Sequence, residues 1–126
     1  MVHILYVALG GAIGASLRHL LNLATLRMLG AHFPWGTLTA NVVGSFAMGM
    51  FVELLVRRFD VSPEVRLLVT TGILGSFTTF SAFSLDVAVL WERGATASAV
   101  IYAGVTVLLS ITALFAGLAL VRTLSG

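Results

Sequence analysis

The 126-residue sequence contains no cysteine and no lysine, and only 10% of its residues are charged. Without cysteine the chain can form neither disulfides nor thiolate metal sites. Because 59% of its residues are hydrophobic, it has too few charges to cover a soluble globule, which predicts an integral membrane protein. Its net charge of +2 reflects arginines scattered along the chain, so nucleic-acid binding is not expected.

Four apolar stretches are long enough to cross a bilayer, at residues 4–28, 37–56, 65–91 and 95–121. Ser62 is expected to cap the third helix, with Pro63 at its first position. No basic segment precedes the first apolar run, so that run is predicted to be a membrane helix and not a cleaved signal. We therefore predict an all-α membrane protein, one domain over residues 1–126, with both termini on the same side.

Residues 72–84, inside the third span, are unusually rich in glycine and hydroxyl residues: Gly72, Gly75, Ser76, Thr78, Thr79, Ser81 and Ser84. Irregular backbone is tolerated in a membrane only where it is buried in protein or lines a watery cavity. Discontinuous membrane helices often direct freed carbonyls at an ion. We therefore predict that the third helix is broken near its middle and that this stretch is the functional centre.

The arginines give only a weak orientation signal. The side of the termini carries Arg57, Arg58, Arg66 and Arg122, and the other side carries Arg27 and Arg93. So small a bias makes insertion in both orientations plausible. Four helices cannot easily enclose a solute route alone, so a homo-oligomer is expected. Small residues four apart could pack helices within one chain or between chains; these pairs are Gly10 and Gly14, Ser45 and Gly49, and Ala113 and Gly117.

Three polar residues stand out within the spans. Arg18 lies in the middle of the first span, where an arginine costs about 2.5–3.5 kcal/mol, so it should face a cavity, a partner or an anion path unless it snorkels to the interface. Asn41 could donate to a neighbouring backbone carbonyl or to an anion. Asp86 could line a vestibule, form a buried pair or be solvated.

Two side-chain stripes follow helical spacing. Phe80, Phe83 and Ser84 share one helix face, and phenylalanine rings turned edge-on could stabilise an anion, although core or lipid contact is the alternative. A row of hydroxyls at four-residue steps lies on the fourth span, at Ser98, Tyr102, Thr106 and Ser110. Such a row can mediate helix contacts or solvate a small anion in transit.

The sequence shows no nucleophile–base arrangement, metal-binding His/Glu spacing or phosphate loop, so it is not expected to be an enzyme. A small dual-topology exporter of cationic drugs is the alternative function, but it would need a central membrane carboxylate, and the first span offers Arg18 and His19 instead. A structural membrane subunit would leave the hydroxyl row and the interrupted third span unexplained.

Residues 10–18, 36–46 and 72–84 together resemble the Fluc (CrcB) fluoride channels, and the resemblance extends over essentially the whole chain. It implies a passive, fluoride-selective channel of the bacterial inner membrane that exports fluoride from the cytoplasm and gives fluoride resistance. It also implies an antiparallel, dual-topology homodimer with two pores at the subunit interface and a structural sodium ion at the centre.

The resemblance also assigns roles to residues. The fluoride pathway would comprise Asn41, Phe80, Ser81, Phe83, Ser84, Tyr102, Thr106 and Ser110. The backbone carbonyls of Gly75 and Thr78 would hold the sodium ion, and Arg18 would match the first-helix arginine. Two positions depart from the family pattern: Ala82 replaces a common threonine, and Leu114 ends the hydroxyl row.

Overall fold

The computed structural model describes residues 2–57 and 61–125, without the side chains of residues 57 and 125, so the expected roles of Arg57 and Arg58 in orientation lie outside the described side chains. Within these ranges the chain is helical, as predicted, apart from its connections and the extended residues Thr78 and Thr79. Four helices are long and apolar enough to cross a membrane: Val2–Leu29, Trp35–Val56, Pro63–Glu92 and Thr96–Leu124. Each predicted span agrees with one of them to within a few residues.

The first, second and fourth spans are single helices: α1 (Val2–Leu29), α2 (Trp35–Arg57) and α6 (Thr96–Ser125).

The third span is built from four pieces. A short α3 (Pro63–Arg66) leads into a π-helical segment, η1 (Leu67–Leu74), which is followed by α4 (Gly75–Phe77) and α5 (Phe80–Glu92). The sequence pattern did not predict the π-helical segment, a rare conformation that often occurs at functional sites.

The predicted start of the third helix is confirmed. Ser62 lies at the N-cap with its Oγ accepting a hydrogen bond from the Val65 amide at 3.2 Å, and Pro63 occupies the first helical position. The connection from α1 to α2 turns at Gly30, and the connection from α5 to α6 turns at Gly94. Both glycines have positive φ values (84° and 83°), a conformation that favours glycine.

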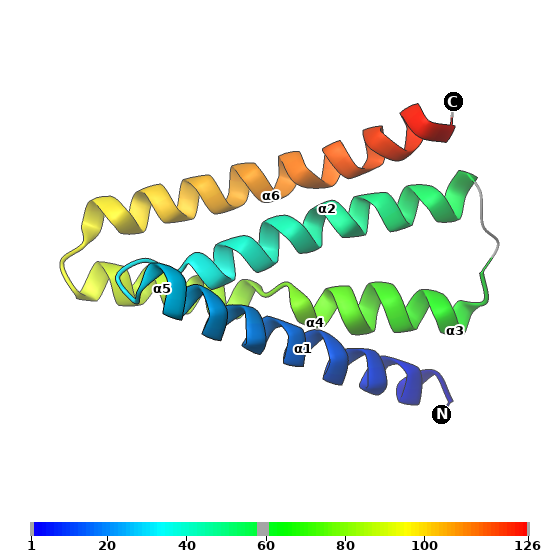
Figure 1. Ribbon diagram of the computed structural model, residues 1–126, viewed down its shortest axis with the longest axis horizontal. Helices are drawn as coiled ribbons and strands as arrows, with labels where there is room; N and C mark the ends of the chain where they lie inside the picture. The colour runs from blue at the N-terminus through cyan, green and yellow to red at the C-terminus, as the bar shows by residue number, and fades with distance from the viewer. Residues whose placement is uncertain (1, 58–60, 126) are drawn as a thin grey trace.

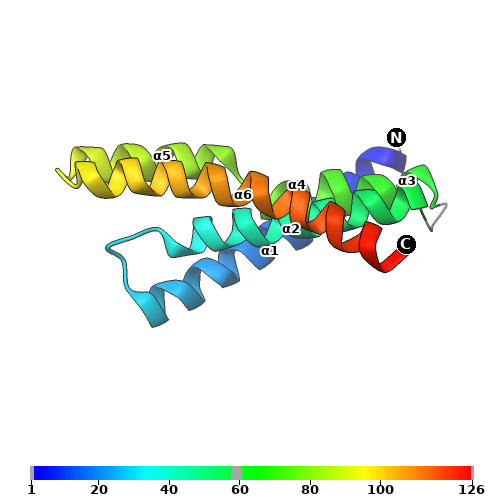
Figure 2. The same cartoon turned by 90° about the horizontal axis from the view of Figure 1, so that it is seen from above.

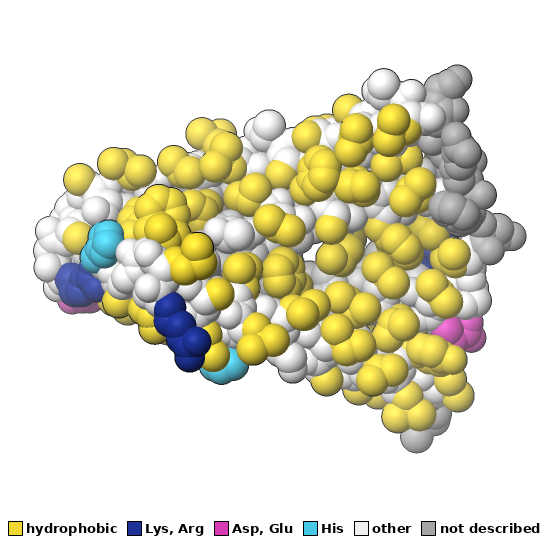
Figure 3. Space-filling model, viewed as in Figure 1, with side chains coloured by type: hydrophobic (Ala, Val, Ile, Leu, Met, Phe, Trp, Pro, Cys, Tyr) yellow, Lys and Arg dark blue, Asp and Glu magenta, His cyan; other side chains and the backbone are white. Residues whose placement is uncertain are grey.

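Figure 1 shows the four spans running along the long axis of the molecule, with both termini at the same end. α2 packs mainly on α6, and α1 packs mainly on η1 and α4. At the end opposite the termini, the α1–α2 hairpin diverges from the paired helices α5 and α6 (Figure 2). The face in Figure 3 is largely apolar through its middle, and its charged side chains lie toward the two ends, as expected of a chain embedded in lipid.

The four glycines among the small residues that could have packed helices within or between chains are used within this chain. A Cβ added at Gly10 would lie 2.8 Å from the Gly72 Cα, and one added at Gly14 would overlap the backbone of η1. Gly49 on α2 and Gly117 on α6 likewise lie against each other's helix backbones. These glycines therefore allow the close approach of α1 to η1 and of α2 to α6.

Candidate functional site

The helical path of the third span is interrupted between α4 and α5. Thr78 and Thr79 have extended backbone conformations, with φ/ψ of −85°/154° and −155°/127°. The Asn41 side chain on α2 binds both backbone groups of Thr79: its Nδ2 donates to the Thr79 carbonyl at 3.1 Å, and its Oδ1 accepts from the Thr79 amide at 2.7 Å. Asn41 therefore supplies the partners that a helix would otherwise provide, and holds the interruption in place.

The two threonines also complete the helix ends around the interruption. Thr79 is the N-cap of α5, and its Oγ1 accepts a hydrogen bond from the Ala82 amide at 3.1 Å. Thr78 donates its hydroxyl hydrogen to the Leu74 carbonyl at 3.0 Å. The hydroxyls of this stretch thus stabilise a helix restart inside the span.

This arrangement releases two carbonyls. In a continuous helix the Thr79 amide would reach the Gly75 carbonyl, and the Ala82 amide would reach the Thr78 carbonyl. Here the first amide donates to Asn41 and the second donates to the Thr79 side chain. The carbonyls of Gly75 and Thr78 therefore lose their usual helical donors, and these are the two carbonyls for which a sodium ligand role was expected.

Arg18 reaches the same region from α1. Its Nε donates to the Ser76 carbonyl at 3.2 Å, and the residue is half-buried. In a continuous helix the Ser76 carbonyl would accept from the amide of Phe80, which here is the first residue of α5. Arg18 was expected to face a cavity, a partner or an anion path, and the structure gives it a partner within the protein, the Ser76 carbonyl.

A cavity of about 320 Å³ lies between α2, the interruption, α5 and α6; we call it the central cavity. Its lining residues are Asn41, Ser45, Thr78, Thr79, Phe80, Phe83, Thr106, Val107, Ser110 and Ile111. Five of the expected pathway residues are therefore brought together from three helices.

The most informative atoms of the central cavity are two hydroxyls on α6. Thr106 Oγ1 and Ser110 Oγ are buried and have no hydrogen-bond partner among the residues that the structure describes. Leaving a buried polar group without a partner costs about 1–3 kcal/mol, so such groups call for a ligand, a water or a function. Both hydroxyls are free to donate to something inside the cavity.

The two phenylalanines of the cavity differ in exposure. Phe83 is 7% exposed and forms part of the wall, whereas Phe80 is 75% exposed on the surface of the chain. Their ring centroids are 5.5 Å apart with a tilt of 53°. A ring as exposed as Phe80 at the edge of a polar cavity is available to contact another molecule.

Three expected pathway residues do not line the central cavity. Ser84 donates its hydroxyl hydrogen to the Phe80 carbonyl at 3.0 Å, and the Ser81 Oγ lies 3.3 Å from the Thr79 Oγ1. Tyr102 is fully buried and donates to the Asp86 Oδ2 at 3.0 Å. Asp86 thus forms a hydrogen-bonded pair, one of the environments that its position had left open.

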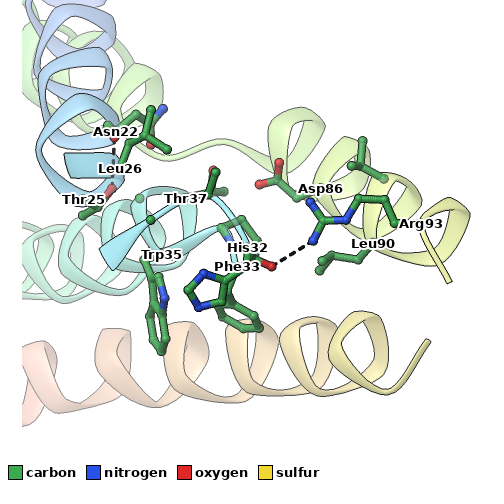
Figure 4. Close-up of a pocket in the computed structure, with 15 residues that line it drawn as sticks. Asn22, Thr25, Leu26, His32, Phe33, Trp35, Thr37, Asp86, Leu90 and Arg93 are labelled. Carbon is green, nitrogen blue, oxygen red and sulfur yellow. Dashed lines mark hydrogen bonds between the residues drawn. The ribbon is translucent and has the colours of Figure 1, made fainter. Parts of the chain in front are cut away.

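A second cavity of about 290 Å³, which we call the end cavity, lies where the two hairpins diverge (Figure 4). Its polar and charged lining residues are Asn22, Thr25, His32, Thr37, Asp86 and Arg93. Arg93 crosses it and donates from Nη2 to the His32 carbonyl at 3.0 Å, the contact that is drawn dashed at the centre of Figure 4.

Tyr102 contacts the linings of both cavities. Its ring meets Phe33 of the end cavity edge-on, with centroids 5.4 Å apart, and meets Phe83 of the central cavity at 5.3 Å. The Tyr102 ring therefore packs between a wall residue of each cavity, and its partner Asp86 lines the end cavity.

The sequence-based reasoning missed two residues of the site. Ser45 lines the central cavity one turn beyond Asn41, and the four-residue spacing could have identified it. Thr79 is clamped through its backbone, for which a sequence carries no signal. Among the described residues, no group of three or more His, Cys, Asp or Glu side chains could hold a metal ion, so any ion would have to use backbone or hydroxyl oxygens.

Comparison with known proteins gives full-length matches. The family described as "CrcB-like protein, Camphor Resistance (CrcB)" matches residues 5–118. The "Fluoride-specific ion channel FluC" of Chelativorans sp. (strain BNC1) is 61% identical over 124 residues, which cover 98% of this chain and 99% of that protein. Proteins of the same name from Mesorhizobium japonicum and Allorhizobium ampelinum are 58% and 46% identical, also with 98% of this chain and 99% of each relative covered.

Proposed function

The chain belongs to the CrcB-like family, and on this premise we propose that it is a passive, fluoride-selective ion channel. The family is one of ion channels and not of enzymes, in agreement with the lack of a catalytic motif. The observation that carries the proposal is the central cavity, where the free hydroxyls of Thr106 and Ser110 lie beside Asn41 and Phe83.

The chemistry of the central cavity suits a small anion. The hydroxyls of Thr106 and Ser110 can each donate a hydrogen, and the Asn41 amide has a second Nδ2 hydrogen besides the one given to Thr79. The edges of Phe80 and Phe83 carry partial positive charge. No lining residue is acidic, so an anion would meet no like charge there. Closely spaced donors in a narrow space can replace the hydration of fluoride, while the larger chloride ion fits them poorly.

We place the remaining pathway residues on either side of this cavity. The Tyr102 ring packs between Phe33 of the end cavity and Phe83 of the central cavity, so an ion moving from one cavity to the other would have to pass its ring and hydroxyl. Ser81 and Ser84 are exposed on α5 near Phe80, on the surface that a second copy would cover.

We further propose an antiparallel, dual-topology homodimer with two pores at its interface. The exposed Phe80 ring beside the central cavity supports this proposal, because a second copy would complete the cavity wall that one copy leaves at the surface. The near balance of arginines between the two sides of the chain is compatible with insertion in both orientations.

A structural sodium ion at the dimer centre fits the residues present. The carbonyls of Gly75 and Thr78 have lost their helical donors, and unwound carbonyls are typical sodium ligands in membrane proteins. When bound, the ion would supply a fixed positive charge near the anion path. Arg18, hydrogen-bonded to the neighbouring Ser76 carbonyl, adds a second positive charge from the same chain.

We assign the channel to the bacterial inner membrane, because the relatives named above come from bacteria. Passive export of fluoride from the cytoplasm through such a channel would give fluoride resistance.

The test is fluoride efflux from sodium-loaded proteoliposomes, followed with a fluoride electrode, with chloride efflux measured in parallel. We expect rapid fluoride loss without chloride loss. Folded, dimeric protein that releases no fluoride would overturn the proposal, and cationic drug transport would then be measured as the alternative function.

A further inference from the structure

Ser45 lines the central cavity from α2, together with Thr106 and Ser110 of α6. α2 and α6 run side by side in the same direction (Figure 1), and added Cβ atoms at Gly49 and Gly117 would each meet the backbone of the other helix, at Leu114 O and Phe46 O. These two glycines therefore lie at about the same level, and counting back along both helices places Ser110 beside Asn41 and Ser45 about one turn further along. The cavity therefore carries polar side chains at successive levels, from Thr106 through Asn41 and Ser110 to Ser45.

The hydroxyl of Ser45 is free to donate. Hydroxyl residues in membrane helices commonly donate to the carbonyl four residues earlier, and five of the described side chains do so: Thr25, Thr70, Thr78, Ser84 and Thr123. Ser45 is half-buried and makes no hydrogen bond of its side chain with any described residue, and Thr106 and Ser110 make none either. Ser45, Thr106 and Ser110 therefore present three hydroxyls without a partner among the described residues to the same cavity.

We propose that Ser45 is a further fluoride-coordinating residue, which adds a coordination level about one helical turn beyond Asn41 and Ser110. This inference rests on the proposed channel function and deepens it. A single pair of donors cannot replace the hydration of a strongly hydrated anion, whereas two successive levels let the ion gain new donors as it leaves the old ones. Sites that hand an ion from one level to the next combine binding with rapid release.

The alternative role of Ser45 is to let α2 and α6 approach, since it belongs to a small-x-x-x-small pair with Gly49. The two roles predict different results for Ser45→Ala. Alanine is as small as serine, so a packing role predicts no change. Loss of a donor to an anion predicts a fluoride efflux rate roughly 10- to 150-fold lower per dimer, because hydrogen bonds to charged groups are worth about 1.5–3 kcal/mol.

The experiment compares wild type, Ser45→Ala, Ser45→Thr, Ser110→Ala and the double variant Ser45→Ala/Ser110→Ala in proteoliposomes. Thr123→Ala is the matched control, because its hydroxyl is exposed and satisfied by its own helix. We expect Ser45→Thr to retain most of the wild-type rate and the control to be unchanged. Because the two serines are neighbouring donors to the same ion, the double variant should lose less than the product of the single losses.

The outcomes separate this inference from the proposed function. Wild-type protein that conducts no fluoride overturns the channel and the inference with it. Wild-type efflux with an equal rate for Ser45→Ala overturns only the role of Ser45. A lower rate for Ser45→Ala that comes with a lower melting temperature or loss of dimer, and that Ser45→Thr does not restore, also overturns it, because a packing defect then explains the loss.

Discussion

Replacing Asn41 with alanine removes both hydrogen bonds that hold the Thr79 peptide between α2 and α5. The Thr79 amide would then be free to return to the Gly75 carbonyl, its partner in a continuous helix. We therefore expect the substitution to act twice. It should destabilise the protein, and it should let the Gly75 carbonyl accept a helical hydrogen bond again, so that this carbonyl is no longer available to an ion.

The stability loss can be estimated from the contacts. Hydrogen bonds between membrane helices are worth about 0.6 kcal/mol on average and about 1.7 kcal/mol at most, so the loss of two should cost about 1–3 kcal/mol. Asn41→Asp should cost less, because its carboxylate can still accept from the Thr79 amide while the bond to the Thr79 carbonyl is lost. Fluoride efflux should stop in both variants. Asn41→Ala removes the amide donor from the central cavity, and Asn41→Asp puts a negative charge there.

The assay is thermal unfolding in detergent beside fluoride efflux from liposomes, with Thr123→Ala as the control. We expect the melting temperatures to fall in the order wild type, Asn41→Asp, Asn41→Ala, with efflux lost in both Asn41 variants. An Asn41→Ala protein as stable as wild type would refute the clamping role. Unchanged efflux in that variant would refute the role of Asn41 in the fluoride path.

Three further results are expected. Changing both Phe80 and Phe83 to isoleucine should abolish fluoride efflux while size-exclusion chromatography still shows the dimer, and unchanged efflux would contradict an aromatic role. Gly14→Val should prevent folding, because the added side chain would overlap the Ile73 carbonyl, and a normal yield of monodisperse protein would contradict the packing of α1 on η1. Exchanging sodium for N-methylglucamine during purification should lower the melting temperature and the efflux rate. Equal melting temperatures and efflux rates in both buffers would contradict the proposed sodium site.

The spans could be predicted from the sequence because a bilayer imposes length and hydropathy so strongly. Local signals also sufficed at Ser62 and Pro63, where cap and first-turn preferences act within four residues. The hydroxyl row was predicted in part. Four residues advance a helix by about 400°, so each step of the row turns it by about 40° and Tyr102 points about 80° away from Ser110. This drift directs Tyr102 to Asp86 and leaves Ser110 in the central cavity.

The partner of Asn41 could not be predicted, because Asn41 and Thr79 are 38 residues apart and the contact depends on how α2 packs against the interruption. The packing also connects the proposed sodium site with the proposed fluoride path. By clamping Thr79, Asn41 deprives the Gly75 carbonyl of its donor, and its remaining amide hydrogen is available inside the central cavity. One side chain thereby favours a cation at the carbonyl side of the interruption and an anion at the cavity side. Loss of Asn41 should therefore abolish fluoride transport and also remove the effect of sodium on the melting temperature, whereas loss of the Thr106 or Ser110 hydroxyl, neither of which is hydrogen-bonded to the interruption, should lower fluoride transport alone.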